Sequence, residues 1–255
     1  MCGIIGISSN KSVSASIISS LKKLEYRGYD SAGIATLFEG EIKEVKSEGR
    51  VDTLEQNFDL KNLKGNIGIG HVRWATHGVP NSVNAHPHSS DNVSVVHNGI
   101  IENYSTIKQK LIKEGFSFDS ETDTEVLVNL IEYVKDKNSV KLGEAVQIAL
   151  NQVVGAYAIA VINNEKPDEI VVAKLGSPLV IGIENNNFYI GSDPSPFIKY
   201  TNRCLYLGDN EMAILNKKKG ITLRSLQTDN ILKPKLEKSN TLRENEYILI
   251  IRNSY

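Results

Sequence analysis

The chain has 255 residues, enough for one large globular domain or two small ones with an ordinary apolar core. Its formal net charge of -1 lacks the basic excess of nucleic-acid-binding proteins, so we expect no nucleic-acid partner. The two cysteines, Cys2 and Cys204, cannot form a disulfide framework and fit a reducing compartment. We see no signal peptide and no apolar stretch of about 18 residues. The expectation is a cytoplasmic protein without a membrane partner.

The first hundred residues predict strands, one helix and a polar segment. CGIIGI reads as a short buried strand, and apolar residues from Val13 to Leu24 at helical spacing predict a helix, with Gly28 at its C-terminal end. Residues 31–49 predict a strand pair that turns at Glu39–Gly40. Residues 66–101 hold the only tryptophan and all five histidines between short apolar runs. That mixture is typical of a site placed on a rigid scaffold.

The remainder predicts three helices followed by strands. Ile107 and Leu111 mark the first helix, Thr122 and Glu125 open the second with capping-box spacing, and the third covers 141–152. The strand segments that follow are YAIAVI, EIVVAKL, PLVIGI, NFYIG, RCLYLG, EMAIL and ITLRSL. Strands, then helices, then strands predict one α+β domain with stacked sheets and helices outside.

Cys2 directly follows the initiator methionine. Because cysteine is small, we expect Met1 to be removed, which leaves a thiol and a free α-amino group on one residue. An α-amine with a pKa of roughly 7.7–8.0 is partly free base at neutral pH and can activate the thiol. Two alternatives stay open. Cys2 could be a small buried hydrophobe, or it could act with one of the histidines.

HNGII at 97–101 has two interpretations. Asn-Gly between apolar residues is first of all a hairpin turn. The functional interpretation is that the Asn98 amide and the Gly99 N–H point together and form an oxyanion hole.

Charged and polar groups gather in two other motifs. In HVRWATHG, Arg73 could clamp a carboxylate or make only a surface salt bridge. Asp123, in ETDTE, stands at a helix start that favours acidic groups and could instead meet a substrate ammonium. His86 and His88 suggest a metal site, but a proline separates them and no cysteine or carboxylate cluster lies nearby, so we expect neither metal nor cofactor.

Together these segments resemble the glutamine-hydrolysing domain of the glutamine–fructose-6-phosphate aminotransferase family, a class II glutamine amidotransferase. The matching segments are MCGIIG, LEYRGYDSAG, HVRWATHG, NAHPH, VVHNGIIEN, SETDTE and LGSPLVIG. They span residues 1 to about 190 in the family's order. The resemblance implies the four-layer αββα sandwich of N-terminal-nucleophile (Ntn) hydrolases. It also implies hydrolysis of the L-glutamine side-chain amide to glutamate and ammonia through a cysteinyl thioester.

The resemblance also implies roles for the residues that carry the chemistry. Cys2 corresponds to the nucleophile, with its own α-amino group as general base and later acid. Asn98 and Gly99 correspond to the oxyanion hole. Arg73 corresponds to the residue that holds the substrate α-carboxylate, and Asp123 to the one that holds its α-ammonium.

Supporting roles are implied in the same way. Thr76 and His77 correspond to further substrate-pocket positions, and Trp74 to the ring that covers the pocket. Arg27 and Gly28 correspond to a loop that supports the Cys2 terminus. The resemblance gives His86 and His88 no catalytic role.

The domain division follows from where the resemblance stops. We expect residues 1–232 to form the glutaminase domain and 233–255 a C-terminal tail of uncertain structure. The family's sugar-isomerase halves, which accept the ammonia to make glucosamine 6-phosphate from fructose 6-phosphate, have no counterpart in these 255 residues. A sugar-isomerase (synthase) domain or subunit is therefore the expected partner. The alternatives are a stand-alone glutaminase and a glutamine-sensing regulatory module.

Overall fold

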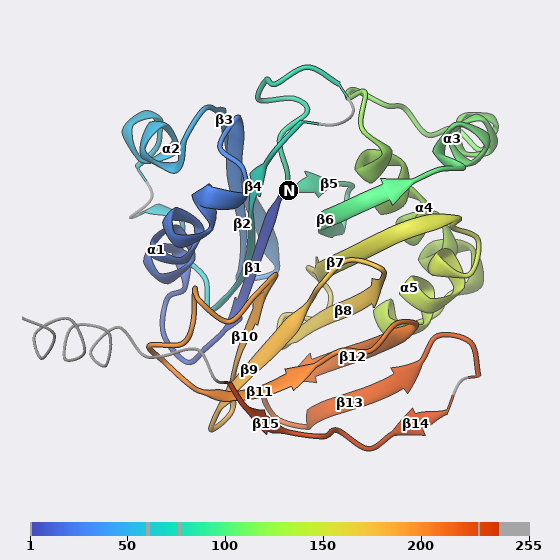
Figure 1. Cartoon of the computed structure of the whole chain (residues 1–255). Coiled ribbons are helices and arrows are strands. Elements are labelled where there is room, and N and C mark those ends of the chain that lie inside the picture. Colours follow the sequence, from blue (N-terminus) through green and yellow to red (C-terminus); the bar gives the residue numbers. More distant parts are fainter. Residues whose placement is uncertain (1, 60–61, 76–77, 229, 240–255) are drawn as a thin grey trace, which may run out of the picture.

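Two antiparallel sheets stack face to face in the computed structural model, which describes residues 2–59, 62–75, 78–228 and 230–239 (Figure 1). The eight-stranded sheet has the order β15 (Glu237–Lys238), β11 (Arg203–Tyr206), β9 (Val180–Glu184), β10 (Asn187–Gly191), β1 (Gly3–Ser8), β4 (Ile67–Arg73), β2 (Ser31–Phe38) and β3 (Glu41–Glu48). The seven-stranded sheet has the order β14 (Ile231–Leu232), β13 (Gly220–Ser225), β12 (Glu211–Asn216), β8 (Glu169–Leu175), β7 (Gly155–Asn163), β6 (Val93–Ile101) and β5 (His88–Ser89).

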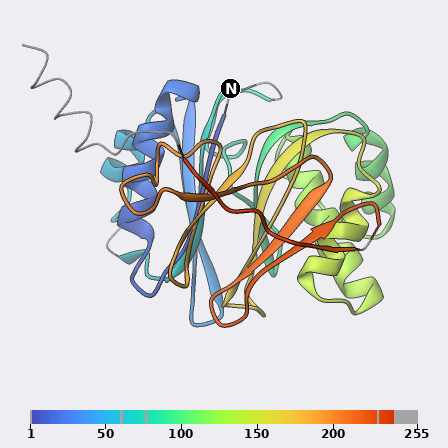
Figure 2. The same cartoon turned by 60° about the horizontal axis from the view of Figure 1, so that its bottom comes forward.

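Helices cover the outer face of each sheet. On the eight-stranded sheet lie α1 (Ser14–Leu24), which a 3₁₀ turn (Glu25–Arg27) extends, and α2 (Val51–Asn57). On the seven-stranded sheet lie α3 (Tyr104–Lys113), α4 (Asp123–Asn138) and α5 (Leu142–Leu150). Figure 2 shows the two helical layers on opposite sides of the paired sheets. The αββα order expected from the resemblance is therefore confirmed.

Alternation along the strands produces three apolar layers. On β1, Ile4 packs between the sheets, whereas Ile5 packs against the α1 layer. On β6, Val96 packs between the sheets and Val95 packs against the layer of α4 and α5. Side chains of a strand point alternately to its two faces, so a strand covered on both faces is apolar at every position. That is why CGIIGI lacks polar alternation.

Most expected elements are confirmed. The strand pair turns at Glu39–Gly40, each of the seven later strand segments contains a strand, and α4 begins where the Thr122 side chain accepts a hydrogen bond from the Glu125 N–H (3.3 Å). The prediction of a hairpin turn at Asn98–Gly99 is wrong, because both residues lie inside β6 and pair with β7. The short α2 was not expected from the sequence.

The C-terminal part of the described chain joins both sheets. Ile231–Leu232 pair with β13, and Glu237–Lys238 add a short edge strand beside β11. The division at residue 232 stays a prediction, and most of the predicted tail, residues 240–255, lies outside the described part. Within the described residues, no helix combines the length and the apolar character needed to cross a membrane.

Candidate functional site

Cys2 directly precedes β1, a central strand of the eight-stranded sheet that has β4 and β10 on either side. Its Sγ accepts a hydrogen bond from the Trp74 N–H (3.2 Å) and donates one to the Trp74 carbonyl (3.4 Å). Burial raises the pKa of the Cys2 thiol, although the Trp74 backbone and the Arg73 charge act in the opposite direction. The thiol is therefore protonated at neutral pH, and a base has to remove its proton before it can act as a nucleophile.

The main-chain carbonyl of Cys2 receives two side-chain donors from distant segments. Arg27 Nε donates to it at 3.0 Å, and Asn98 Nδ2 donates to it at 3.2 Å. Asp193 in turn holds Arg27, with 3.3 Å between Nη1 and Oδ2, and accepts a hydrogen bond from the Tyr26 hydroxyl at 2.6 Å. These contacts fix the backbone of the residue that carries the thiol.

Gly28 leaves room for the segment that carries Arg73 and Trp74. A Cβ on Gly28 would lie 2.8 Å from the carbonyl carbon and oxygen of Arg73, and backbone atoms cannot give way to it. Close approach, rather than a left-handed backbone, explains the glycine, because its φ of 176° is extended. Nearby, Asp30 Oδ2 accepts a hydrogen bond from the Ala75 N–H at 2.7 Å, which adds a second contact to the same segment.

Asn98 joins the two sheets beneath Cys2. Its Nδ2 donates to Ser192 Oγ (3.0 Å) as well as to the Cys2 carbonyl, and its Oδ1 lies 2.9 Å from His71 Nε2. Gly99 beside it has a φ of 132°, and a Cβ there would lie 2.0 Å from the Ala156 carbonyl oxygen. The β7 backbone therefore requires glycine at this position, whatever role its N–H has in chemistry.

Arg73 and Asp123 bring opposite charges to the site. Arg73 ends β4 and is buried, and its Nη2 lies 3.5 Å from the Gly78 carbonyl. Burial lowers the pKa of Arg73, and the charges of Cys2, Asp30 and Asp123 oppose that shift. Asp123 is the first residue of α4, and its Oδ2 accepts a hydrogen bond from the Ile101 N–H at 2.8 Å. The helix dipole favours a negative charge at this position.

Trp74 contributes its backbone to the site and its ring to the surface. The residue is 49% exposed, and its ring meets Tyr29 edge-on at a centroid distance of 5.9 Å. Two predicted pocket positions, Thr76 and His77, lie outside the described residues. The structure therefore brings Cys2, Arg27 and Asn98 into direct contact and places Gly28 and Trp74 beside them. The Arg73 charge acts on Cys2, and the Asp123 charge acts on Arg73.

Three histidines form a buried column under Asn98. The ring centroids of His71 and His86 are 4.3 Å apart, and those of His86 and His88 are 5.0 Å apart. Burial lowers the pKa of His71 to about 3 and the pKa values of His86 and His88 well below their usual range, with further lowering from neighbouring positive charge. In the described parts of the chain, no three potential ligand side chains converge as a metal site.

The neutral histidine column makes the folded state sensitive to acid. Below about pH 6.5 the unfolded chain binds a proton on each histidine and the folded chain does not, so stability falls as the pH falls. Each fully neutral histidine contributes about 1.4 kcal/mol per pH unit, so the three together reach about 4 kcal/mol per unit. Urea denaturation between pH 6.5 and 5, above the range where carboxylates titrate, measures this slope. His86→Phe is expected to remove about a third of it, and a flat profile would contradict the burial argument.

Sequence reasoning missed four residues that support the site. They are Asp30, His71, Ser192 and Asp193. Each acts through a neighbour: Ser192 Oγ accepts from the Ile4 N–H (2.9 Å) and from Asn98, and Asp193 holds Arg27. The polar segment SDPS, which directly follows the predicted strand NFYIG, was the available signal for the last two, because functional residues are often placed just after the end of a strand.

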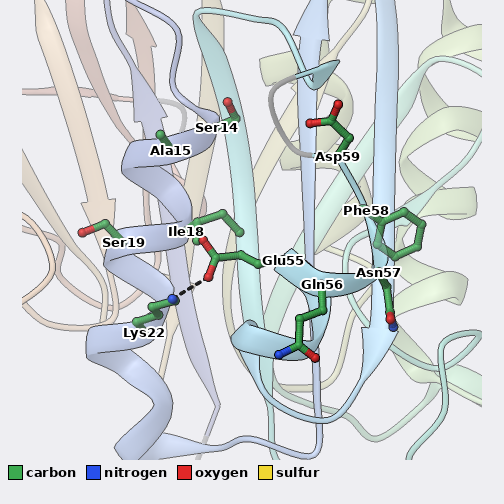
Figure 3. A pocket seen from close by; sticks show the side chains of 10 residues that line it. All are labelled: Ser14, Ala15, Ile18, Ser19, Lys22, Glu55, Gln56, Asn57, Phe58 and Asp59. Atoms are coloured by element: carbon green, nitrogen blue, oxygen red, sulfur yellow. Dashed lines mark ion pairs between the residues drawn. The ribbon is translucent and has the colours of Figure 1, made fainter.

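A separate cavity of about 730 Å³ lies between α1 and α2, on the outer face of the eight-stranded sheet (Figure 3). Its lining includes Ile18 of α1 and Phe58 after α2. Lys22 points across it toward Glu55 and also pairs with Asp52 at 2.7 Å. The sheet separates this cavity from Asn98, so it is not part of the site around Cys2.

Comparison with known proteins gives the family. A family model described as a glutamine amidotransferase domain matches residues 59–223. The chain belongs to this family. The amidotransferase domain is 48% identical over 242 residues to the glutamine–fructose-6-phosphate aminotransferase (isomerizing) of Bacteroides thetaiotaomicron, a match that covers 93% of this chain and 39% of that protein. The chain thus spans about two fifths of this relative, and the resemblance seen in its motifs is confirmed.

Solved structures agree with the fold of the amidotransferase domain. The glutamine phosphoribosylpyrophosphate amidotransferase of B. subtilis, complexed with ADP and GMP, superposes with a TM-score of 0.76 at 30% identity over 90% of this chain and 50% of that one. A structure titled as the allosteric regulatory enzyme of purine biosynthesis superposes with a TM-score of 0.77 at 28% identity over 89% of this chain and 49% of that one.

Proposed function

We propose that this amidotransferase domain hydrolyses the side-chain amide of L-glutamine to glutamate and ammonia. The observation that carries the proposal is the placement of Cys2, whose thiol and carbonyl are both held in position at the start of a central strand. A nucleophile fixed in this way, with a base on its own α-carbon, is suited to acyl transfer.

The reaction balances through a thioester. The free α-amine of Cys2 takes the thiol proton, Sγ bonds to the amide carbon, and an oxyanion forms on the former carbonyl oxygen. The carbon–nitrogen bond then breaks, and ammonia leaves with the proton that the α-ammonium returns. Water next attacks the thioester, with the α-amine again as base, and releases glutamate and the thiol. Asn98 and the Gly99 N–H are the proposed donors to the oxyanion.

A pair of opposite charges supports a free amino acid as substrate. Arg73 is the proposed partner of the α-carboxylate, which guanidinium binds through two hydrogen bonds, and Asp123 of the α-ammonium. Thr76, His77 and the Trp74 ring are proposed to complete the pocket, and Arg27 and Gly28 to support the terminus. An acyl group within a peptide lacks the two charges that this pair selects.

The proposed charge pair is tested by changing Asp123 in the protein and the α-amine in the substrate. Asp123→Asn is expected to raise KM for glutamine roughly 100-fold or more, since an uncompensated charge in a closed site costs about 3–5 kcal/mol. The asparagine keeps an oxygen that can accept from the Ile101 N–H, so the α4 terminus stays intact. Steady-state ammonia release measures the effect.

Two controls accompany this test. The alkylation rate of Cys2 in Asp123→Asn should equal that of the wild type, because Asp123 does not contact the thiol. Glutamine acetylated on its α-amine should be a very poor substrate of the wild type. Hydrolysis of the acetylated compound at a rate comparable to that of glutamine would contradict the proposed charge-pair pocket and would favour a hydrolase that acts on a broader range of amides.

The ammonia acceptor is proposed from the relatives. A sugar-isomerase synthase domain, in the same polypeptide or as a separate subunit, would use the ammonia to convert fructose 6-phosphate to glucosamine 6-phosphate. A cytoplasmic location is proposed because the nucleophilic thiol has to stay reduced. Ammonia release that rises when a sugar-isomerase chain and fructose 6-phosphate are added would support this partner, and unchanged release would favour a stand-alone glutaminase.

A further inference from the structure

We propose that His71 is a positioning residue that holds the Asn98 amide with its NH₂ group toward Cys2, so that this group can donate to the oxyanion. The inference rests on the proposed glutaminase function and extends it to a residue on the opposite sheet. His71 is fully buried in β4 of the eight-stranded sheet, whereas Asn98 belongs to β6 of the seven-stranded sheet. The contact of 2.9 Å between His71 Nε2 and Asn98 Oδ1 therefore crosses the sandwich.

The hydrogen-bond partners of Asn98 determine which end of its side-chain amide is the oxygen and which is the NH₂ group. One end lies 3.2 Å from the Cys2 carbonyl oxygen and 3.0 Å from Ser192 Oγ. A carbonyl oxygen only accepts hydrogen bonds, so this end must be the NH₂ group. The other end is then the oxygen, and the nitrogen that faces it must carry the proton. The structure thus assigns His71 the tautomer with its proton on Nε2.

The charge state of His71 keeps this donor present at every working pH. Burial lowers its pKa to about 3, and the positive charges of His97 and Arg73 act in the same direction, whereas the hydrogen bonds to Asn98 and to the His97 backbone offset only part of this shift. His86, which packs against the ring, adds no negative charge. The ring therefore stays neutral through the physiological range and keeps its single proton on Nε2. A donor that does not titrate holds the amide without adding a pH dependence of its own.

The orientation matters because the Cys2 carbonyl has two donors. Arg27 Nε and Asn98 Nδ2 both reach it, at 3.0 and 3.2 Å. When an oxyanion develops, Asn98 can redirect one N–H to it while Arg27 still satisfies the carbonyl. That exchange requires the NH₂ end to stay on the Cys2 side. With the His71 donor removed, Asn98 Oδ1 is left buried without its partner, and the amide loses the contact that fixes its orientation.

Two substitutions of His71 distinguish the effect of its hydrogen-bond donor from the effect of its ring. His71→Leu removes the donor and is expected to lower kcat by roughly 10- to 100-fold, below the roughly 10²–10³ of losing the oxyanion donor itself, with less than a threefold change in KM. His71→Gln places an amide donor near the former Nε2 and should recover kcat to within roughly threefold of the wild type. His86→Leu, which disturbs the same column without touching Asn98, is the matched control and should keep kcat. An equal fall of kcat in His86→Leu, or no fall in His71→Leu, overturns the proposal.

An inhibitor isolates the tetrahedral state. Glutamate γ-semialdehyde adds the Cys2 thiol across its aldehyde, so that a sulfur–carbon bond forms and the thiol proton passes to oxygen. Its affinity should fall in His71→Leu by about the same factor as kcat, whereas the affinity for glutamate should stay unchanged. An unchanged semialdehyde affinity contradicts the proposal.

Nitrogen NMR of the wild-type protein tests the same inference without activity. The ¹⁵N shifts of His71 should show the Nε2–H tautomer, unchanged from pH 5.5 to 8. A titrating ring or an Nδ1–H tautomer overturns the proposal even if the variants fail to fold. Glutamine hydrolysis by the wild type, and its loss in Cys2→Ala, tests the proposed function separately. Failure of that function and failure of the His71 inference are therefore distinguishable.

Discussion

A chain that retains Met1, or that carries any N-terminal extension, is expected to hydrolyse glutamine roughly 10²–10⁴-fold more slowly than the chain that begins at Cys2. An extension turns the α-amine into an amide and removes the proposed base. Burial raises the pKa of the Cys2 thiol, so the thiol does not ionise by itself at neutral pH. The carbonyl of Cys2 is held by Arg27 and Asn98, so the backbone cannot shift to compensate.

An extension that a protease removes directly before Cys2 provides the control, because cleavage should restore activity in the same sample. Intact-mass spectrometry reports the fraction of chains that begin at Cys2, and activity should be proportional to that fraction. A fully active sample in which Met1 is retained would show that the α-amine is not the base. Another group would then have to act as the base, and a histidine acting with Cys2 would become the favoured alternative.

Asn98→Ala is expected to lower kcat by roughly 10²–10³ with little change in KM, because the proposed role of its donor is to stabilise the tetrahedral intermediate rather than bound glutamine. The same side chain contacts His71 and Ser192, so the variant should also lose about 1–3 kcal/mol of stability from buried groups left without partners. Steady-state kinetics and urea denaturation measure the two effects separately.

Asn163→Ala is the matched control for stability. Asn163 is a buried asparagine at the far end of β7, where its Oδ1 accepts a hydrogen bond from the Glu165 N–H at 2.8 Å. Its loss removes this hydrogen bond and should lower stability by about 0.5–1.5 kcal/mol, while kcat stays intact. A large rise in KM with kcat intact in Asn98→Ala would make Asn98 a substrate-binding residue instead.

Local patterns predicted the elements well where one local force dominates. The Thr122 cap and the apolar strands after Ala156 depend on neighbours in sequence, and each segment folds as its pattern indicates. The Asn98–Gly99 hairpin failed because Asn-Gly also suits a strand whose partner approaches closely. Gly99 adopts its φ of 132° inside β6, where the Ala156 backbone lies too close for a side chain. No local sequence signal distinguishes a glycine required by such a close strand partner from a glycine in a turn.

The site could be predicted only in part for a related reason. Motif resemblance located Cys2, Arg27 and Asn98, which the structure brings into contact. His71 and Asp193 contribute through pairings that join segments far apart in the sequence. A histidine inside an apolar strand and an aspartate after another strand look like ordinary core and turn residues until the sheets are assembled. Long-range geometry, which periodicity does not encode, gives them their contacts.

The pairing of β1 sets when the proposed nucleophile, Cys2, can be held in position during synthesis. β1 is synthesised before its partner strand, because Ile5 pairs with Gly191 of β10, and Asp193, which holds Arg27, follows directly. At about 5–20 residues per second, the strand waits roughly 10 to 40 s for that partner. A nascent chain therefore carries Cys2, the proposed nucleophile, long before it carries the residues that hold it in position. Glutamine hydrolysis should begin only once the second half of the domain has been made, so unfinished chains release no ammonia.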